Sequence, residues 1–452
     1  MNSSIAQKDV AAHLHSYTNL AQAGQVEPLV IVQGDGIHVV DDRGRRYLEG
    51  MSGLWCASLG FNHPRLIAAA TQALNTLPYY HTFYHRTNNA VAELAERLLA
   101  VAPAPMGKVF FANSGSEAND SAAKMVWYYH NAIGKPQKKK IIARRNAYHG
   151  VTAVAASMGG LASNHNDFDL PISTRFLHTE CPHLYRNGLP GETEEAFATR
   201  LAGLLEQQIL QEGPETVAAF IAEPVMGAGG VIVPPAGYFE KVQAVLRKYN
   251  VLMIADEVIC GFGRTGNMFG STTFNIQPDI LTCAKGLSSA YMPISAVMVS
   301  AQVYEAIAQN SARHGRFGHG YTYSGHPVAA AVALEVLKVY EEDNIVARTR
   351  DLAPQFGGAL RRLAQRRHVG EVRTIGLIGA IELVQDKEKK VGFTDGKSGV
   401  TVAQYAQEEG LIVRPLGDAV AFCPPLIIEP KQVDELFSRF DRALDRFERE
   451  IH

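Results

Sequence analysis

The chain contains a short apolar run, Ile280-Leu281-Thr282-Cys283-Ala284, that closes in Lys285 and Gly286. A second run, Val251-Leu252-Met253-Ile254-Ala255, closes in Asp256. Runs of this kind, alternating with helical periods, are typical of the buried strands of an α/β sheet. In such a sheet, ligands bind outside the carboxyl ends of the strands. We therefore expect the amine and the carboxylate to emerge from neighbouring strand ends into one cleft.

An amine and a carboxylate in one cleft fit Schiff-base chemistry on a carbonyl cofactor. A lysine whose pKa is lowered by burial is the usual nucleophile toward such a carbonyl. A carboxylate that keeps a pyridine nitrogen protonated makes pyridoxal phosphate an electron sink. The pairing of Lys285 with Asp256 therefore predicts a pyridoxal-phosphate enzyme.

The size and charge of the chain favour a globular protein that acts on small molecules. Its 452 residues exceed one ordinary domain, and 46% hydrophobic residues are enough to fill two or three cores. The formal net charge is only -2, whereas proteins that bind nucleic acid or membrane surfaces carry clustered positive charge. The basic run Lys138-Lys139-Lys140 is better explained as a solvated loop. We expect small polar ligands, not a nucleic acid or a membrane.

The N-terminal segment and the cysteines indicate a reducing compartment. Residues 1–24 mix polar residues with Ala and His and lack a basic start followed by an apolar run, and no window approaches a membrane span. The cysteines are odd in number, far apart and mostly set in apolar segments. They are Cys56, Cys181, Cys260, Cys283 and Cys423. The sequence predicts a cytoplasmic protein without disulfides.

The apolar runs divide the chain into three parts. Residues 1–70 begin with a helical stretch, followed by strand-like runs and a turn at 41–44, which predicts a small antiparallel unit. Residues 71–325 predict a mostly parallel sheet covered on both faces. Residues 326–452 hold a long helix at 328–342, strands near 375–383, 411–414 and 419–423, and a closing helix near 431–450. The expected strands of the large sheet are Val109–Phe111, Ile141–Ala143, Val217–Ala222, Val251–Ala255, Ile280–Ala284 and Ala296–Ser300.

A turn of small residues follows the first strand of the large sheet. Asn113-Ser114-Gly115-Ser116-Glu117 opens a helix whose apolar residues keep helical spacing. A helix N-terminus exposes backbone N–H groups to an anion, and the two serines add hydroxyls. An ordinary N-cap is the alternative, because Ser and Asn cap most helices. Beside Lys285 and Asp256, we favour a phosphate cup.

Two further strand ends carry residues of interest. After Ile141–Ala143 the chain reaches Tyr148-His149-Gly150, whose aromatic face could stack on a planar ring; a packing aromatic and a satisfied core histidine are the alternatives. Val217–Ala222 ends in Glu223-Pro224, and Gly227-Ala228-Gly229-Gly230 follows. This glycine run lacks the following helix and the distal acid of a dinucleotide-binding motif.

The sequence predicts neither a metal site nor a P-loop. His81 and His85 have the i, i+4 spacing that can bind zinc on a helix, but no third ligand is evident. No Gly-Lys-Ser or Gly-Lys-Thr follows a glycine loop, which excludes a P-loop nucleotide site.

Taken in order, these motifs resemble those of the class III aminotransferases of fold type I, over nearly the whole chain. The most specific segments are Ile254–Gly266 and, nearly thirty residues after Asp256, Ala284-Lys285-Gly286. The resemblance implies a large domain with a mostly parallel seven-stranded sheet and a small α/β domain built from the N- and C-terminal segments. It implies that pyridoxal 5'-phosphate is bound by Ser114, Gly115, Ser116, Tyr148, His149, Glu223, Asp256, Val258 and Lys285.

The resemblance also implies a homodimer, or a dimer of dimers, with shared active sites. Tyr321-Thr322-Tyr323-Ser324-Gly325-His326-Pro327 resembles the segment that reaches a partner subunit's phosphate, which places Tyr321 and Thr322 among the cofactor-binding residues.

Within the class, the chain is similar to the ω-amino acid:pyruvate and amine:pyruvate transaminases. Gly53-Leu54-Trp55-Cys56, Phe83 and Arg414 carry this likeness. It implies that Trp55, Tyr148 and the partner subunit's Phe83 line a small and a large substrate pocket, beside Leu54. Arg414 would receive a carboxylate, for which the planar guanidinium is better suited than an ammonium. A structural or solvent-facing arginine is the alternative.

Two positions depart from the γ-aminobutyrate and ornithine aminotransferases. A glutamate that holds the active-site arginine in those enzymes is replaced by Ala228, and a glutamine three residues after the ring aspartate is replaced by Ile259. Both changes favour amines and ω-amino acids with apolar bodies over ornithine.

We therefore expect an enzyme that moves an amino group from an amine or ω-amino acid to pyruvate, giving alanine, by a ping-pong mechanism. Lys285 would carry the proton between the substrate carbon and the cofactor, and Asp256 would keep the pyridinium charged. A racemase or aminomutase is an alternative, because the same fold and lysine support those reactions. A non-catalytic pyridoxal-binding protein is a second.

Overall fold

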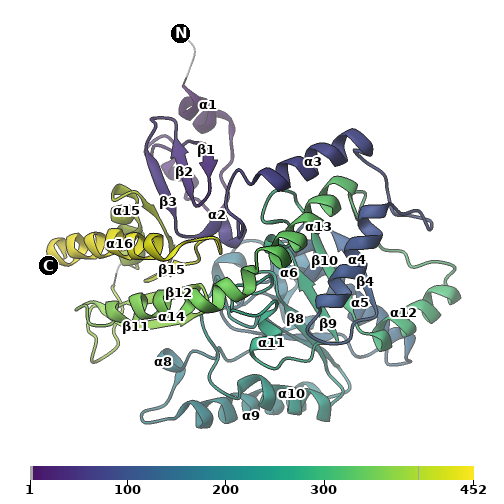
Figure 1. Cartoon of the computed structure of the whole chain (residues 1–452). Helices are drawn as coiled ribbons and strands as arrows, with labels where there is room; N and C mark the ends of the chain where they lie inside the picture. The colour runs from purple at the N-terminus through teal and green to yellow at the C-terminus, as the bar shows by residue number, and fades with distance from the viewer. Residues whose placement is uncertain (1–3, 395, 452) are drawn as a thin grey trace.

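The computed structural model describes residues 4–394 and 396–451, which form a central seven-stranded sheet with helices on both faces and two four-stranded sheets at one side (Figure 1). The central order is β4-β10-β9-β8-β7-β5-β6. The pairs from β9 to β6 are parallel, and β10 alone runs antiparallel to both of its neighbours. The predicted mostly parallel sheet is confirmed. Its strands are β4 Lys108–Ala112, β5 Lys140–Arg144, β6 Phe176–Thr179, β7 Val217–Ala222, β8 Leu252–Asp256, β9 Ile280–Cys283 and β10 Ser295–Val299.

Six of these strands lie where the sequence predicts them, and β6 is the one that the prediction missed. Asp256 is the last residue of β8 rather than the first residue after it, and Ala284 lies beyond β9. Every residue of β7, β8, β9 and β10 is buried, which explains their continuous apolar runs.

Alternate side chains of the central strands enter two separate cores. On one face, Ile141, Ile254 and Val297 pack with α5 (Gly115–Ala132) and α12 (Ala301–Arg313). On the other face lie Phe220, Met253 and Leu281, in one cluster with residues of α9, α10 and α13. The helices on or near this face are α4 Asn89–Val101, α9 Glu194–Glu212, α10 Tyr238–Lys248 and α13 Pro327–Glu342, and shorter helices are α6 Ala153–Met158, α7 Ile172–Arg175, α8 Leu184–Asn187 and α11 Gly270–Thr273.

The N-terminal sheet takes a strand from the far end of the chain. β1 (Ile31–Asp35), β2 (His38–Asp41) and β3 (Arg46–Glu49) are antiparallel, as predicted, but β13 (Leu411–Ile412) pairs parallel with β3. Helix α1 spans Ile5–Ala12, α2 spans Ser52–Trp55 and α3 spans Pro64–Thr76. Residues near both ends of the chain therefore build one sheet.

The C-terminal sheet has the order β11-β12-β15-β14, with strands β11 Val369–Ile375, β12 Ile378–Leu383, β14 Arg414–Leu416 and β15 Ala419–Phe422. The single strand expected near 375–383 is in fact an antiparallel hairpin. The strand expected at 411–414 divides at Val413, because Leu411 and Ile412 join the N-terminal sheet while Arg414 joins this one. Its helices are α14 Ile345–Leu363, α15 Ser398–Glu408 and α16 Pro430–Glu450. The domain boundaries at 70 and 325 stay a prediction.

Lys138, which the sequence suggested to be a solvated loop residue, is 1% exposed. Its ammonium donates to the carbonyls of Tyr249 and Asn250, at 3.0 and 2.9 Å, just after α10. The cation therefore satisfies carbonyls beyond a helix C-terminus, where positive charge is favoured.

Among the described residues, none of the helices combines the length and the apolar character that crossing a lipid bilayer requires.

Candidate active site

A pocket lies at the carboxyl ends of β4, β5, β7, β8 and β9, where the sequence predicts the ligand site. Except for Asn119 and Gly150, every residue that lines it is a predicted site residue. The lining residues are Gly115, Ser116, Asn119, Tyr148, His149, Gly150, Glu223, Asp256, Val258, Ile259 and Lys285.

Lys285 opens a short 3₁₀ turn directly after β9, and its side chain is half-buried. Its backbone φ is +47°, in the left-handed region that non-glycine residues rarely adopt. Such a conformation costs roughly 1–2 kcal/mol, so the surrounding structure must hold it in place. The strained turn aims the amine into the same pocket as the carboxylate of Asp256.

Asp256 is a buried carboxylate that is fixed from several directions. Its Oδ2 accepts from His149 Nδ1 at 2.8 Å and from Asn119 Nδ2 at 2.7 Å, and its Oδ1 accepts from the backbone N–H of Val258 at 3.1 Å. The Asn119 side chain is itself oriented by the hydroxyl of Thr282, which donates to Asn119 Oδ1 at 2.8 Å. This network leaves Oδ1 with one donor, so it can accept another from the pocket.

His149 belongs to this network through one of its two ring nitrogens. A carboxylate only accepts hydrogen bonds, so the nitrogen that faces Asp256 carries the hydrogen. The opposite nitrogen, Nε2, is buried and has no partner among the residues that the structure describes. The predicted ring-stacking segment therefore contributes an orienting contact to Asp256 as well as the Tyr148 ring.

Glu223 is a second buried carboxylate, and it supports two walls of the pocket. It accepts from the backbone N–H of Tyr148 at 3.1 Å and from that of Gly227 at 2.9 Å. Burial raises the pKa of Glu223, and the nearby charge of Asp256 acts in the same direction. Glu223 therefore links the Tyr148 segment to the start of the glycine run.

The opposite end of the pocket is the N-terminus of α5. Ser114 is the N-cap and accepts from the N–H of Glu117 at 3.2 Å. The ordinary helix cap, which the sequence left open as an alternative to a phosphate cup, is therefore present. Gly115 and Ser116 occupy the first helical positions, whose N–H groups have no partner within a helix. A Cβ on Gly150 would lie 2.5 Å from Ser116 Oγ, so only glycine lets this loop approach the helix end so closely. The result is a cradle of N–H donors at the positive end of a helix dipole.

These groups fit pyridoxal phosphate. The helix N-terminus offers donors to a phosphate, Asp256 offers an acceptor to a protonated ring nitrogen, and Lys285 offers an amine to the aldehyde. Tyr148 and Val258 line the same pocket.

Two of the predicted substrate residues, Trp55 and Arg414, lie next to this pocket. Trp55 is buried in one apolar cluster with Ile259, and the guanidinium of Arg414 lies 6.0 Å from the centre of the Trp55 ring. Burial lowers the pKa of Arg414, and the neighbouring hydroxyl of Tyr148 opposes this shift. Within residues 4–394 and 396–451, no carboxylate pairs with Arg414. Leu54 is 54% exposed and Ala228 is half-buried, and neither lines the pocket.

A buried acid that the sequence did not reveal supports the Trp55 turn. Glu49, at the end of β3, accepts from the N–H of Met51 at 2.8 Å, and burial raises its pKa to about 7. The turn that follows has positive φ at Ser52, Gly53 and Trp55, a strained path that needs such support. The isolated carboxylate on a strand gave no sequence signal.

Tyr17 also escaped the prediction. Its hydroxyl lies near that of Tyr148 and donates to Asn164 at 3.2 Å. Burial raises the pKa of Tyr148, and Tyr17 adds to this effect. Because the two tyrosines are 131 positions apart in the sequence, a local motif could not have identified the contact.

Three predicted residues lie elsewhere. Phe83 packs on Gly320, and Thr322 is exposed; its carbonyl accepts from Tyr79 at 2.9 Å. Phe83 lines a separate groove that residues 315–320 also line. Tyr321 contacts α5 through Ser121, at 3.2 Å. The two segments predicted to face a partner subunit are therefore adjacent to each other, and the structure does not bring them into the Lys285 pocket.

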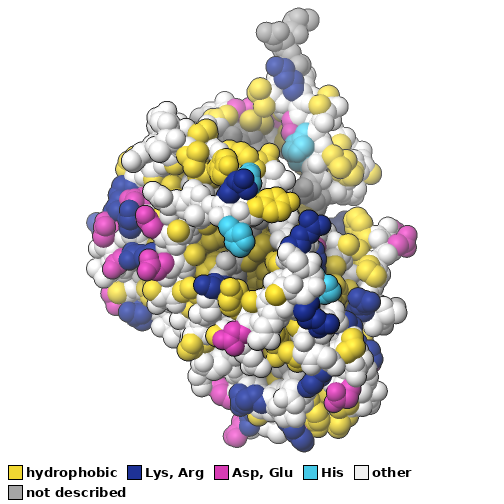
Figure 2. Space-filling model, turned by 90° about the vertical axis from the view of Figure 1, so that its right-hand side faces the viewer, with side chains coloured by type: hydrophobic (Ala, Val, Ile, Leu, Met, Phe, Trp, Pro, Cys, Tyr) yellow, Lys and Arg dark blue, Asp and Glu magenta, His cyan; other side chains and the backbone are white. Residues whose placement is uncertain are grey.

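This groove belongs to a face with much exposed apolar surface. Figure 2 shows the side of the molecule on which α3, α4 and α12 lie, where hydrophobic side chains surround a hollow. The segment between α3 and α4 contributes large exposed side chains, namely Leu77, Tyr79, Tyr80, Phe83 and Tyr84. Apolar surface of this extent is typical of a protein interface.

Comparison with known proteins identifies relatives of the whole chain. The family model for class III aminotransferases matches residues 20–444. A γ-aminobutyrate transaminase of tomato, named as mitochondrial, is 52% identical over 432 residues, which cover 95% of this chain and 84% of the relative. A chloroplastic γ-aminobutyrate transaminase of the same plant is 51% identical over 428 residues, covering 94% and 82%.

Solved structures agree in fold over the same length. The ω-transaminase of Pseudomonas jessenii, in complex with PMP, has a TM-score of 0.97 at 55% identity and covers 98% of each chain. A PMP-bound aminotransferase of Vibrio fluvialis has a TM-score of 0.97 at 43% identity and covers 100% of both chains. PMP is the amine form of pyridoxal phosphate.

Proposed function

The chain belongs to the class III aminotransferases, which are pyridoxal-phosphate enzymes, and from this premise we propose that it transfers an amino group from an amine or ω-amino acid to pyruvate. The family accounts for the cofactor and the reaction type. The identities of the donor and the acceptor are our proposal, and they rest on the residues around Arg414.

The observation that carries the proposal is the guanidinium of Arg414. It is half-buried beside Trp55, and no carboxylate of the described chain neutralises it. A cation that loses hydration without gaining an ion pair is costly to keep, and a carboxylate ligand would remove that cost. Pyruvate and ω-amino acids each bring such a carboxylate.

The donor is proposed to have an apolar body. Ile259 and Trp55 present an apolar wall, and Ala228 offers no charge to a second polar group on the substrate. The plant relatives are named γ-aminobutyrate transaminases, and γ-aminobutyrate is an ω-amino acid whose carboxylate suits Arg414. It is therefore a second candidate donor.

The pocket residues have different roles in the proposed reaction. When bound, pyridoxal phosphate supplies a carbonyl that condenses with amines and a ring that takes up the electrons of a broken C–H bond. We assign to Lys285 the movement of the proton at the substrate carbon, since its amine faces the pocket. Asp256 holds the ring nitrogen protonated through Oδ1, while His149 and Asn119 keep its carboxylate in place.

A homodimer with shared active sites is part of the proposal. Phe83 and Thr322 lie in adjacent segments on an apolar face, outside the pocket of their own chain. That placement suits residues that complete the pocket of a second copy. The cytoplasmic location stays a prediction from residues 1–24.

The test is a donor panel with two acceptors. Purified enzyme loaded with pyridoxal phosphate is incubated with racemic 1-phenylethylamine, β-alanine or γ-aminobutyrate, and with pyruvate or 2-oxoglutarate, and alanine and glutamate are measured. Alanine formed from pyruvate with the apolar amine supports the proposal and excludes a racemase or aminomutase. Glutamate formation alone would contradict it, as would a preparation that keeps its yellow colour when amine is added.

A further inference from the structure

A glycine-rich turn, Gly227-Ala228-Gly229-Gly230, packs against Ile259, a residue that lines the pocket, and we call it the Ala228 turn. On the pocket side, Gly227 donates to Glu223, and a Cβ on Gly227 would lie only 2.3 Å from Ile259 Cδ1. A Cβ on Gly229 would lie 2.4 Å from the carbonyl of Asn146. Neither glycine leaves room for a side chain, and Gly227 lies directly against Ile259, which lines the pocket.

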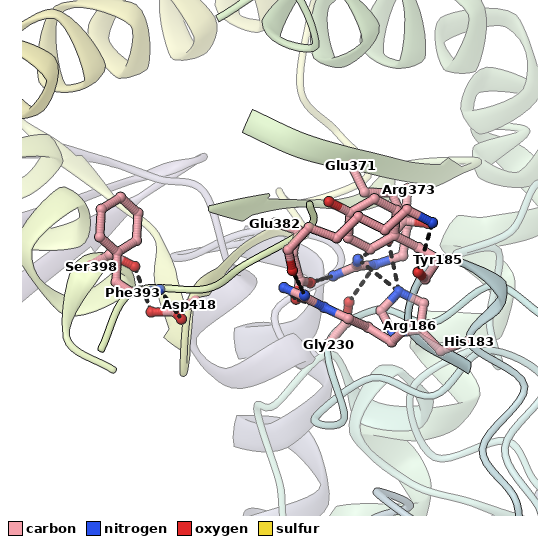
Figure 3. Close-up of polar contacts among 11 residues, drawn as sticks. His183, Tyr185, Arg186, Gly230, Glu371, Arg373, Glu382, Phe393, Ser398 and Asp418 are labelled. Carbon is pink, nitrogen blue, oxygen red and sulfur yellow. Dashed lines mark hydrogen bonds and ion pairs between the residues drawn. The ribbon is translucent and has the colours of Figure 1, made fainter. Parts of the chain in front are cut away.

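The other side of the Ala228 turn is held by one arginine. Arg373, on β11, donates from Nε to the carbonyl of Gly230 at 2.9 Å, and its side chain is only 5% exposed. The same guanidinium contacts Glu371, Glu382 at 2.9 Å, and Nε2 of His183 at 3.2 Å (Figure 3). We call Arg373, Glu371, Glu382 and His183 the Arg373 cluster. Because the cluster fixes the guanidinium from several directions, its Nε has a defined position at the turn.

Together with Arg186, the charges of the cluster are balanced. Two carboxylates, of Glu371 and Glu382, face two guanidinium groups, because Arg186 of α8 also pairs with Glu382 at 2.9 Å. Burial would raise the pKa of Glu371, but the hydrogen bond from His183 and the charge of Arg373 lower it. His183, Glu371 and Glu382 have the donor atoms of a metal site, yet the Arg373 guanidinium already contacts all three. The cluster thus holds an arginine in the place that a cation would take.

We infer that Arg373 is a positioning residue of the substrate site, which fixes the Ala228 turn through Gly230 and so sets the position of Ile259 in the pocket wall. This inference deepens the proposed function and rests on it. Arg186 offers a matched comparison: it binds the same Glu382, but its other described hydrogen bond goes to the carbonyl of Lys390, away from the turn.

The first measurement is amide hydrogen exchange of the enzyme loaded with pyridoxal phosphate. In the native turn, the N–H groups of Gly230 and Val231 both donate to the carbonyl of Gly227. In Arg373→Met the carbonyl of Gly230 loses its buried donor, so peptides that span 225–232 should exchange about ten-fold faster. Arg186→Met should leave those peptides unchanged. Equal exchange in the two variants would overturn the inference.

The second measurement separates positioning from general damage. With pyruvate as acceptor, Arg373→Met should raise KM for 1-phenylethylamine by about ten-fold, while kcat and the visible absorbance of the bound cofactor stay within about two-fold. Arg373→Lys keeps a cation between the carboxylates but lacks the planar fork, so its KM should lie between those of wild type and Arg373→Met.

The two measurements also distinguish this inference from the proposed function. If wild type fails with every amine donor, the proposed function is wrong, and hydrogen exchange still shows whether Arg373 holds the turn. If wild type is active and Arg373→Met matches Arg186→Met in KM or in exchange, the inference alone is wrong. If Arg373→Met does not fold, Arg373→Lys decides: a wild-type KM or wild-type exchange in that variant overturns the inference, and increases in both support it.

Discussion

Replacing Arg414 by leucine should impair reaction with keto acids and spare reaction with uncharged amines. Leucine keeps an apolar contact with Trp55, whose ring centre lies 6.0 Å from the guanidinium. Arg414 has no carboxylate partner within the described chain, so the substitution leaves no buried charge unpaired. We therefore expect the melting temperature to stay the same or to rise slightly.

The expected loss follows from the interaction that the substrate carboxylate makes. A hydrogen bond to a charged group contributes about 1.5–3 kcal/mol, so the affinity for pyruvate should fall roughly ten- to a hundred-fold. Arg414→Lys retains the charge without the planar fork and should fall between wild type and Arg414→Leu.

The assay treats the two half-reactions separately. Loss of the yellow colour with 1-phenylethylamine, without any acceptor, reports the donor half. Its return when pyruvate is added to the amine-loaded enzyme reports the acceptor half. Equal losses in both halves would show that Arg414 is structural and that another group binds the carboxylate.

Three other changes test the remaining assignments. Lys285→Ala should abolish turnover, since a positioned base contributes roughly a hundred- to ten-thousand-fold; near-normal turnover would remove Lys285 from the mechanism. Asp256→Asn should lower the rate far more than the melting temperature, because the side-chain volume is kept while the charge facing the ring is lost; losses in proportion would make Asp256 a structural acid. Burial raises the pKa of Glu49 from 4.5 to about 7. Between these two pH values the folded state keeps a proton on Glu49 that the unfolded state releases. The stability that this proton gives, about 3 kcal/mol, is present below pH 4.5 and is lost as pH rises through 7. Glu49→Gln should therefore melt progressively higher than wild type between about pH 5 and pH 8, and a difference that does not change with pH would refute the assignment.

The buried strands were predictable because their sequence signal is local. Parallel strands covered on both faces must be apolar throughout, and Val217–Ala222 and Ile280–Cys283 show this plainly. The strand Phe176–Thr179 has only two apolar residues followed by His and Thr, so the same signal is too weak. In the hairpin at 369–383, the turn at Gly376 and Leu377 lies within an apolar segment, which hides the boundary between two strands.

The site was predictable to the extent that it lies at strand ends. Asp256 ends one apolar run and Lys285 follows another. The order of these strands in the sheet brings both residues into one pocket. Glu49 and Tyr17 have no such signal, because their roles come from contacts with a strained turn and with a distant ring. Residues whose function depends on packing between separate segments can be recognised only from the three-dimensional structure.

The division of residues 411–416 between two sheets has a practical consequence for redesign of the pocket. Ile412 accepts from the N–H of Gly50, while Arg414, two residues later, is paired in β14. The backbone that carries Trp55 and the backbone that carries Arg414 are thus bonded to each other. Lengthening the segment before Trp55 or the segment before Arg414 to admit a bulkier amine would displace Arg414, the group that we propose binds the acceptor. Space for larger substrates should instead be made by shortening side chains, with both backbones left as they are.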